Sequence, residues 1–265
     1  MEILRYMKKG KLHAKIIAGR LIILLTVILN FSACSKKNSD KVLRIGTEIG
    51  YPPFEYLDED GKTLIGFDVD LWTELCHRLG MKAQVCDTQW TGILSGLDAD
   101  RYDCIISAIT ITKERQERFL VTEPYVQNSE CFIVNADRAD KKIEGPEKLN
   151  GLKVAYQAET VSDVFVTNLI DNGADFTTFE YDKLLDAFDD LEFGRVDVVV
   201  AESAASGIIV RNRKNLRIDF VGEPDAFFGI VVSKNNSELF NKIQSALAQM
   251  KEDGFINSLE EKWLK

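Results

Sequence analysis

Arg115 lies where a basic side chain is normally unfavourable, and this placement suggests a role in binding an anion. The apolar, β-branched run over residues 105–111 predicts a buried strand, and Thr112 then supplies the N-cap of a helix. A strand that leads directly into a helix N-terminus presents free backbone N–H groups to an anion. The helix dipole disfavours a cation there by about 0.3–1 kcal/mol, so Arg115 is a candidate for bidentate recognition of a carboxylate. The alternative is a solvated arginine on an amphipathic helix.

Three further candidates follow the ends of predicted strands. Strands at residues 42–47, 82–86 and 103–106 alternate with helices, one of which begins at the N-cap Asp68 and stops at Gly80. This alternation predicts an open α/β sheet, in which ligands bind beyond the carboxyl ends of the strands. Glu48, Tyr51 and Trp90 follow those ends. The alternatives are a rim position for Glu48 and core positions for the two aromatic residues.

The same alternation restarts near residue 130. Strands are expected at residues 153–156, 175–181 and 196–200, helices at 161–170 and 183–193, and a further strand at 227–232. The tail, residues 237–264, is expected to be amphipathic helix. Because 265 residues are more than one core usually serves, the sequence predicts two lobes.

The N-terminal segment is predicted to lie outside the fold. Six basic residues among the first 20 precede an apolar block at residues 21–31, which is too short for a stable bilayer-spanning helix. Residues 31–34, Phe-Ser-Ala-Cys, resemble the bacterial lipobox, although the usual first residue is Leu. The resemblance implies a signal peptide over 1–33, lipidation of Cys34, with palmitate as an acyl group, and an anchored tether over 34–41. Plain cleavage and a retained anchor helix are the alternatives.

The remaining chain is acidic and lacks a metal-binding pattern. Removing residues 1–33 takes away six of the 33 basic and one of the 42 acidic residues, which leaves a net charge of −14 and argues against nucleic acid. None of the remaining cysteines has metal-ligand spacing and His77 is the only histidine left, so no metal or cofactor is expected. Free, buried thiols are predicted, with a Cys76–Cys86 bridge as the alternative. The four cysteines are Cys76, Cys86, Cys104 and Cys131.

Residues 66–71, Gly-Phe-Asp-Val-Asp-Leu, resemble the signature of the solute-binding proteins of ABC importers, in particular the polar amino acid receptors of family 3. Residues 110–115, 195–197 and 253–263 agree with it. The resemblance implies a two-lobed α/β, type II periplasmic-binding-protein-like fold in which two crossover strands join two open sheets. Lobe 1 is expected to comprise residues 42–127 plus 224–265, and lobe 2 residues 128–223.

The resemblance also implies that the lobes close on an α-amino acid. Arg115 would hold the α-carboxylate with backbone N–H groups near Thr110 and Val161, whereas Glu202 and the carbonyl of Ala108 would hold the α-ammonium. Such a pair is physically sensible, because desolvating either charge of a zwitterion without a partner is expensive. The aromatic side chains would sandwich the ligand side chain. The complete predicted ligand-binding set is Glu48, Tyr51, Trp90, Ala108, Thr110, Arg115, Gln157, Thr160, Val161 and Glu202.

The loop after the first strand of lobe 2 departs from the family pattern. The family usually has Gln, any residue, Gly, Thr, Thr, and this chain has Gln157-Ala158-Glu159-Thr160-Val161. Glu159 adds a second acid beside Glu48, which favours a cationic ligand such as arginine or lysine. Glutamine, cystine and other polar amino acids are the alternatives.

The resemblance implies a monomeric, non-catalytic receptor outside the cytoplasm, lipid-anchored to the membrane and delivering its ligand to a permease and ATPase. The first alternative is a dehydratase-like enzyme on the same fold, with Glu48 or Glu159 as general acid. A ligand sensor that acts on a membrane partner is the second. A third, local alternative makes Glu202 a helix cap before Ser203.

Overall fold

The structure, a computed structural model, describes residues 41–138 and 142–265. The predicted signal peptide, the lipidated Cys34 and the tether up to residue 40 therefore lie outside the described residues. Residues 41–265 form one compact unit. No helix in the described part of the chain is long and apolar enough to cross a membrane.

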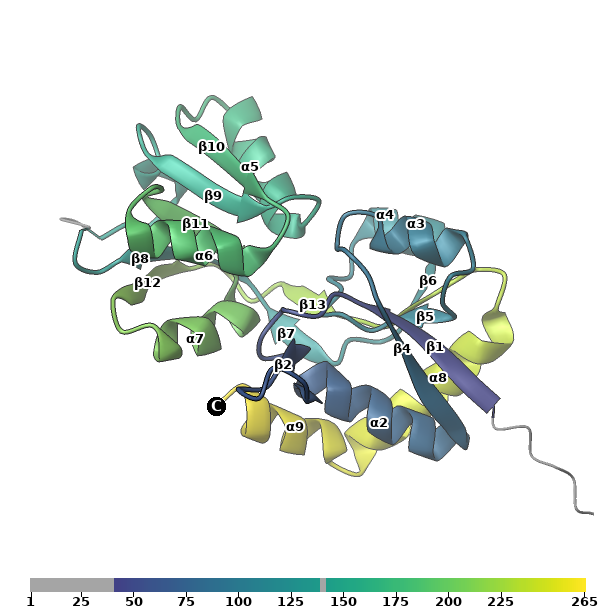
Figure 1. Cartoon of the computed structure of the whole chain (residues 1–265). Helices are drawn as coiled ribbons and strands as arrows, with labels where there is room; N and C mark the ends of the chain where they lie inside the picture. Colours follow the sequence, from purple (N-terminus) through teal and green to yellow (C-terminus); the bar gives the residue numbers. More distant parts are fainter. Residues whose placement is uncertain (1–40, 139–141) are drawn as a thin grey trace, which may run out of the picture. The chain divides into compact units, whose positions relative to one another are not determined.

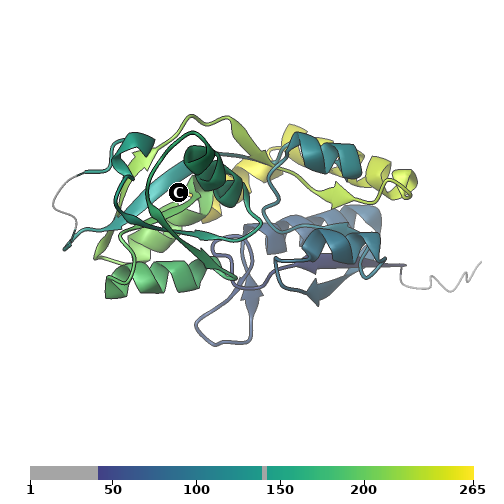
Figure 2. The ribbon, with the colours of Figure 1, turned by 90° about the horizontal axis from the view of Figure 1, so that it is seen from above.

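The first sheet contains the N-terminal strand and has the order β4-β1-β5-β14-β6. Strands β1 and β4 run parallel over seven residue pairs, side by side in both views (Figures 1 and 2). Strand β5 is also parallel to β1, whereas β14 runs antiparallel to both of its neighbours, β5 and β6. The bounds are β1 Lys41–Thr47, β4 Met81–Asp87, β5 Cys104–Ile105, β6 Leu120–Val121 and β14 Val231–Val232. A small hairpin, β2 Tyr56–Leu57 and β3 Leu64–Ile65, precedes the first helix.

Helices cover both faces of this sheet because its side chains alternate between two cores. Cys104 and Ile106 belong to the core that α2, α8 and α9 cover, whereas Ile105 belongs to the core under α3. The apolar stripe of α2 makes this packing possible, since Leu71 and Leu75 are fully buried one turn apart. The bounds are α2 Phe67–Leu79, α3 Ile93–Asp98, α4 Lys113–Arg118, α8 Ser237–Glu252 and α9 Phe255–Trp263.

The second sheet has the order β10-β9-β11-β8-β12, with β8 antiparallel to both of its neighbours. Its side chains also alternate: Ile133 and Val199 share a core with α6 and α7, and Phe132 and Val200 share one with α5. The strands are β8 Glu130–Asn135, β9 Lys153–Gln157, β10 Thr177–Tyr181, β11 Val198–Glu202 and β12 Leu216–Val221. The helices are η1 Pro146–Lys148, α5 Val161–Asp171, α6 Leu184–Phe193 and α7 Ser203–Asn212.

The chain passes between the sheets twice. Strand β7 (Val126–Asn128) links β6 to β8, and β13 (Ala226–Phe228) links β12 to β14. The two strands pair antiparallel with each other, and Figure 1 labels them in the connecting region. Two open α/β sheets joined by two crossover strands are the fold class that the sequence predicts, so that prediction is confirmed.

Asp68 does not cap helix α2, and this prediction is wrong. The helix begins at Phe67 after Gly66, whose φ of 140° and contact with the backbone of Phe54 exclude a side chain. The carboxylate of Asp68 is instead fully buried, where it accepts hydrogen bonds from Ala108 N–H (2.7 Å) and Tyr125 O–H (3.0 Å). Partners distant in sequence have taken the place of the local cap.

Two further predicted elements are shorter than expected. The strand predicted over residues 103–106, at the start of the apolar run 105–111, ends at Ile105, and Ala108 takes a positive φ of 45° that no strand continues. The tail is two helices, since Gly254 has a φ of 83° between α8 and α9. The four cysteines that the structure describes are free; Cys76, Cys104 and Cys131 are buried as predicted, but Cys86 is partly exposed.

Candidate functional site

Glu48 lies in the loop that follows β1 and is buried, with only 5% of its surface exposed. Its backbone N–H donates to Ser107 Oγ (3.0 Å), and its Oε2 accepts from Gln157 Nε2 (2.9 Å) on the second sheet. Burial raises the pKa of Glu48, although the hydrogen bond from Gln157 opposes that rise. A rim position for this carboxylate is therefore excluded.

Glu202 ends strand β11 and is the second buried acid of the site, with 6% of its surface exposed. Tyr51 O–H (2.9 Å) donates to its Oε2, and Asn128 Nδ2 (2.9 Å) and the Thr110 hydroxyl donate to its Oε1. Burial still raises the pKa of Glu202. Glu202 is the N-cap residue of helix α7, as the capping alternative expects, but its side chain makes no cap bond.

Arg115 lies in the first turn of α4, and Thr112 is the N-cap as predicted, accepting from Arg115 N–H (3.2 Å). Its guanidinium turns inward: Nη1 donates to the carbonyl of Thr110 (2.7 Å), and the group lies 5.6 Å from the centroid of the Trp90 ring. Burial lowers the pKa of Arg115, and the charge of Glu202 opposes this shift. The alternative of a solvated surface arginine is wrong.

The loop from Gln157 to Val161 closes the site from the second sheet. Thr160 caps α5 by accepting from Asp163 N–H (3.3 Å), and its hydroxyl donates to the carbonyl of Gln157 (2.7 Å). Glu159 has a φ of 57°, a left-handed conformation that glycine adopts with less strain. Val161 is the first residue of α5.

These residues surround adjoining pockets. A pocket of about 230 Å³ is lined by Glu48, Tyr51, Trp90, Ser107, Ala108, Gln157, Thr160 and Glu202. We call it the inner pocket, and seven of the ten predicted ligand-binding residues line it. A neighbouring space of about 180 Å³ shares Tyr51, Gln157, Thr160 and Glu202 and adds Ser162 and Leu184.

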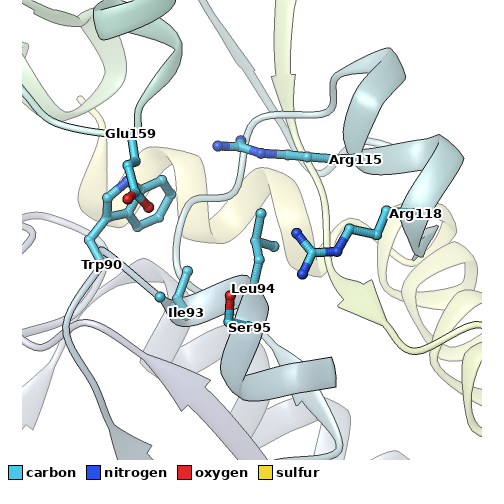
Figure 3. Close-up of a pocket in the computed structure, with 8 residues that line it drawn as sticks. Trp90, Ile93, Leu94, Ser95, Arg115, Arg118 and Glu159 are labelled. Carbon is cyan, nitrogen blue, oxygen red and sulfur yellow. The ribbon is translucent and has the colours of Figure 1, made fainter. Parts of the chain in front are cut away.

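An outer pocket of about 350 Å³ also has Trp90 in its lining (Figure 3). Arg115, Arg118 and Glu159 bring charged side chains to it, and all three are labelled in Figure 3. The remaining lining comes from α3 and the loop before it: Gly92, Ile93, Leu94 and Ser95. Arg115 therefore belongs to the outer pocket, whereas the two buried acids face the inner one.

Thr110 connects the cation and the acid of the site. Its carbonyl accepts from Arg115 and its hydroxyl donates to Glu202, so one residue contacts both charged groups. A fixed cation and a fixed anion bridged in this way suit a ligand that carries both charges a short distance apart. Within residues 41–138 and 142–265 no group of three or more His, Cys, Asp or Glu side chains could hold a metal ion.

Several polar residues of the site were not predicted from the sequence. Ser107 and Asn128 are buried and bond directly to predicted site residues, and Ser162 donates to Glu130 Oε2 (2.7 Å). Glu130 lies close enough to Glu202 that burial and this neighbouring charge raise its pKa to about 8. The one sequence signal that these residues share is a polar side chain within or beside an apolar strand. This pattern is too common in proteins to identify a binding residue.

Two open α/β lobes with charged groups of opposite sign between their strand ends define a ligand-binding protein of the periplasmic type. The chain belongs to the bacterial extracellular solute-binding proteins, family 3, whose model matches residues 43–265. The predicted family is thereby confirmed.

Curated relatives align over most of the chain. The "Putative ABC transporter arginine-binding protein 2" of Escherichia coli K12 is 29% identical over 92% of this chain and 98% of its own length. The "L-cystine-binding protein TcyJ" of the same strain is 31% identical over 83% and 82%.

Solved structures share the fold. An ancestral arginine-binding protein bound to arginine has a TM-score of 0.79 at 33% identity, covering 84% of this chain and 98% of its own. The ancestral amino acid-binding protein AncCDT-1, described as a precursor of cyclohexadienyl dehydratase, has a TM-score of 0.76 at 31% identity, covering 84% and 95%.

Proposed function

We propose that this protein is the substrate-binding component of an amino acid ABC importer and that it binds a cationic L-amino acid, with arginine as the first candidate. The observation that carries the proposal is the pairing of Arg115 and Glu202 through Thr110, beside a second buried acid, Glu48. Relatives named as arginine-binding and a structural neighbour bound to arginine support it.

In this proposal the ligand backbone lies between Arg115 and Glu202. The three hydrogen bonds to Glu202 come from neutral donors, so the α-ammonium supplies the compensating charge that this buried carboxylate lacks. The α-carboxylate pairs with Arg115. One N–H group of the guanidinium donates to the carbonyl of Thr110 in this structure. Because these groups come from different sheets, only the closed arrangement satisfies both ends of the zwitterion.

The ligand side chain lies in the inner pocket between the two aromatic rings. Glu48 now accepts from Gln157, and a guanidinium or ammonium group offers a stronger, charge-assisted donor to the same oxygen. Tyr51 and Trp90 line the same pocket and offer flat faces to an alkyl chain or a guanidinium plane. Glutamine would keep only neutral hydrogen bonds to Glu48, which is why a cationic ligand is preferred.

The proposal includes the N-terminal features and the lobe boundaries that the sequence predicts. The signal peptide (1–33), the acylated Cys34 and the tether would hold residues 42–265 at the outer face of a membrane as a monomer. Lobe 1 would comprise 42–127 plus 224–265 and lobe 2 would comprise 128–223. Incorporation of labelled palmitate into the wild-type chain, and its loss in Cys34→Ala, tests the anchor.

We infer a non-catalytic role. The family alternative, a dehydratase with Glu48 as general acid, needs a protonated carboxyl group. Hydrogen bonds from Gln157 and, at 3.4 Å, from Trp90 N–H oppose the rise in the pKa of Glu48 that burial causes. Glu159 faces the outer pocket, apart from the inner one.

The test is a thermal-shift panel of L-amino acids on residues 35–265, followed by calorimetry of any ligand that binds. A ligand at 100 times its Kd should add about 2.7 kcal/mol to the free energy of unfolding. Arginine and lysine are expected to give the largest shifts. If no amino acid raises the melting temperature, the receptor function is wrong; if only cystine or glutamine does, the cationic preference is wrong.

A further inference from the structure

Two carboxyl groups lie against each other in the core behind the inner pocket. Glu55 follows the loop after β1, Asp68 lies in the first turn of α2, and both residues are fully buried. The two groups are close enough to affect each other, and burial together with the charge of Asp68 raises the pKa of Glu55 well above its ordinary value. Burial also raises the pKa of Asp68 to about 7, against the bonds from Ala108 and Tyr125.

The hydrogen bonds of the pair leave one oxygen of each group without a donor. Ser107 Oγ donates to Glu55 Oε1, and Ala108 N–H and Tyr125 O–H donate to Asp68 Oδ2. Glu55 Oε2 and Asp68 Oδ1 are buried and have no hydrogen-bond partner in the described part of the chain. Two ionised carboxylates cannot share such a site, whereas one proton between these two oxygens supplies the missing donor.

We propose that Glu55 and Asp68 share a single proton between Oε2 and Oδ1, and that this proton holds Ser107 and Ala108 in their place in the ligand pocket. Ser107 Oγ accepts from Glu48 N–H (3.0 Å), so the pair also supports the acid assigned to the ligand side chain. Ala108 keeps its positive φ of 45° while its N–H bonds to Asp68. The statement about the pocket rests on the proposed function; the shared proton does not.

The surroundings of the pair determine the effect of pH. Of the neighbouring titratable groups, Glu48 opposes a second negative charge on the pair, whereas the Tyr125 hydroxyl favours ionisation of Asp68 by donating to it. Tyr51 is a neutral phenol, because burial and the nearby carboxylates raise its pKa. The folded protein therefore keeps a proton that the unfolded chain releases in the ordinary carboxyl range. Since the folded state binds more protons, stability falls as pH rises from that range through the raised pKa of the pair.

Glu55→Gln separates this proposal from a merely structural role. The amide of glutamine donates permanently where the shared proton now does, so the variant should fold and be at least as stable as the wild type near neutral pH. Its stability and ligand affinity should no longer fall through the pair's titration range, whereas wild-type affinity should fall by up to about tenfold per pH unit above it. Glu55→Ala should be less stable at every pH, because it leaves Ser107 and Asp68 without partners.

The proton is observed directly by infrared difference spectroscopy of the wild-type protein against Glu55→Gln at neutral pH. A carbonyl stretch of a protonated carboxyl group should appear in the difference spectrum, free of the contribution of Glu130 because both proteins contain that residue. Asp70→Asn, on the same helix and paired with Lys262 at the surface, is the matched control and should leave no such band.

Each result is decisive. The absence of the band, or parallel pH profiles for wild type and Glu55→Gln, overturns the shared proton. A band and a flattened stability profile without any binding of amino acids retain the shared proton and reject the proposed function. A flattened stability profile with an unchanged pH profile of affinity overturns the link from the pair to the pocket.

Discussion

Glu202→Gln should change the free and the ligand-bound protein in opposite directions. Burial raises the pKa of Glu202, which means that ionisation costs the folded protein stability at neutral pH. Glutamine keeps the shape and can keep three hydrogen bonds: its oxygen accepts from Asn128 and Thr110, and its amide donates to the Tyr51 hydroxyl. The free variant should therefore unfold at the same temperature as the wild-type protein or above it.

Binding should weaken strongly in the same variant. Loss of one member of a buried charge pair costs about 2–5 kcal/mol, which corresponds to roughly 30-fold to several-thousand-fold in Kd. At an arginine concentration of 100 wild-type Kd, a variant that binds 100-fold more weakly gains only about 0.4 kcal/mol, against about 2.7 kcal/mol for the wild type. Thermal denaturation with and without arginine measures both effects, and calorimetry gives the Kd.

Glu130→Gln is the matched control. The pKa of Glu130 is about 8, so this nearby acid is largely neutral at pH 7, and glutamine changes little there. Arginine should stabilise the control as much as it stabilises the wild type. Arginine affinity within about twofold of wild type in Glu202→Gln would falsify the assignment of the ammonium site.

Three further predictions concern the other charged residues of the site. Arg115→Ala should cost about 2–5 kcal/mol of arginine binding by calorimetry, whereas Lys113→Ala, which removes an exposed cation of the same helix, should cost nothing; equal losses contradict the carboxylate role. Glu48→Gln should weaken arginine binding far more than glutamine binding, and an equal loss of both in competition assays argues against the cationic preference. Glu159→Gly should raise the free energy of unfolding by up to about 1 kcal/mol in urea denaturation, because the positive φ of 57° suits glycine. A variant less stable than the wild type would contradict the claim that Glu159 has a strained backbone.

Periodicity and family resemblance together predicted the fold class and seven of the eight residues around the inner pocket. They succeeded because strand and helix periods report the faces of each element, and because α/β sheets bind ligands at predictable strand ends. Arg115 was found by a local inconsistency, a cation in a first helical turn, that only a tertiary contact resolves. Thr112 is visible as a cap because its partner lies three residues away.

The errors share a physical cause, which is that local patterns do not contain distant partners. Asp68 has the residue type and position of an N-cap, but its carboxylate bonds to Ala108, 40 residues further along the chain. The positive φ of Ala108 ends the predicted strand, and nothing in an alanine signals that conformation. The partners of Glu202 are also distant, since Tyr51 and Asn128 lie 151 and 74 residues away.

Strand β7 not only connects the two sheets but also carries Asn128, which contacts the site. Its amide donates to Glu202, while its Oδ1 accepts from Ser203 Oγ (3.2 Å) and Ala204 N–H (3.1 Å) at the start of α7. A change in the charge next to Glu202 therefore alters the environment of the Asn128 side chain, which belongs to a crossover strand. The side-chain amide resonance of Asn128 is in consequence an internal probe by which occupancy of the pocket can be followed in magnetic resonance spectra, without attaching a label.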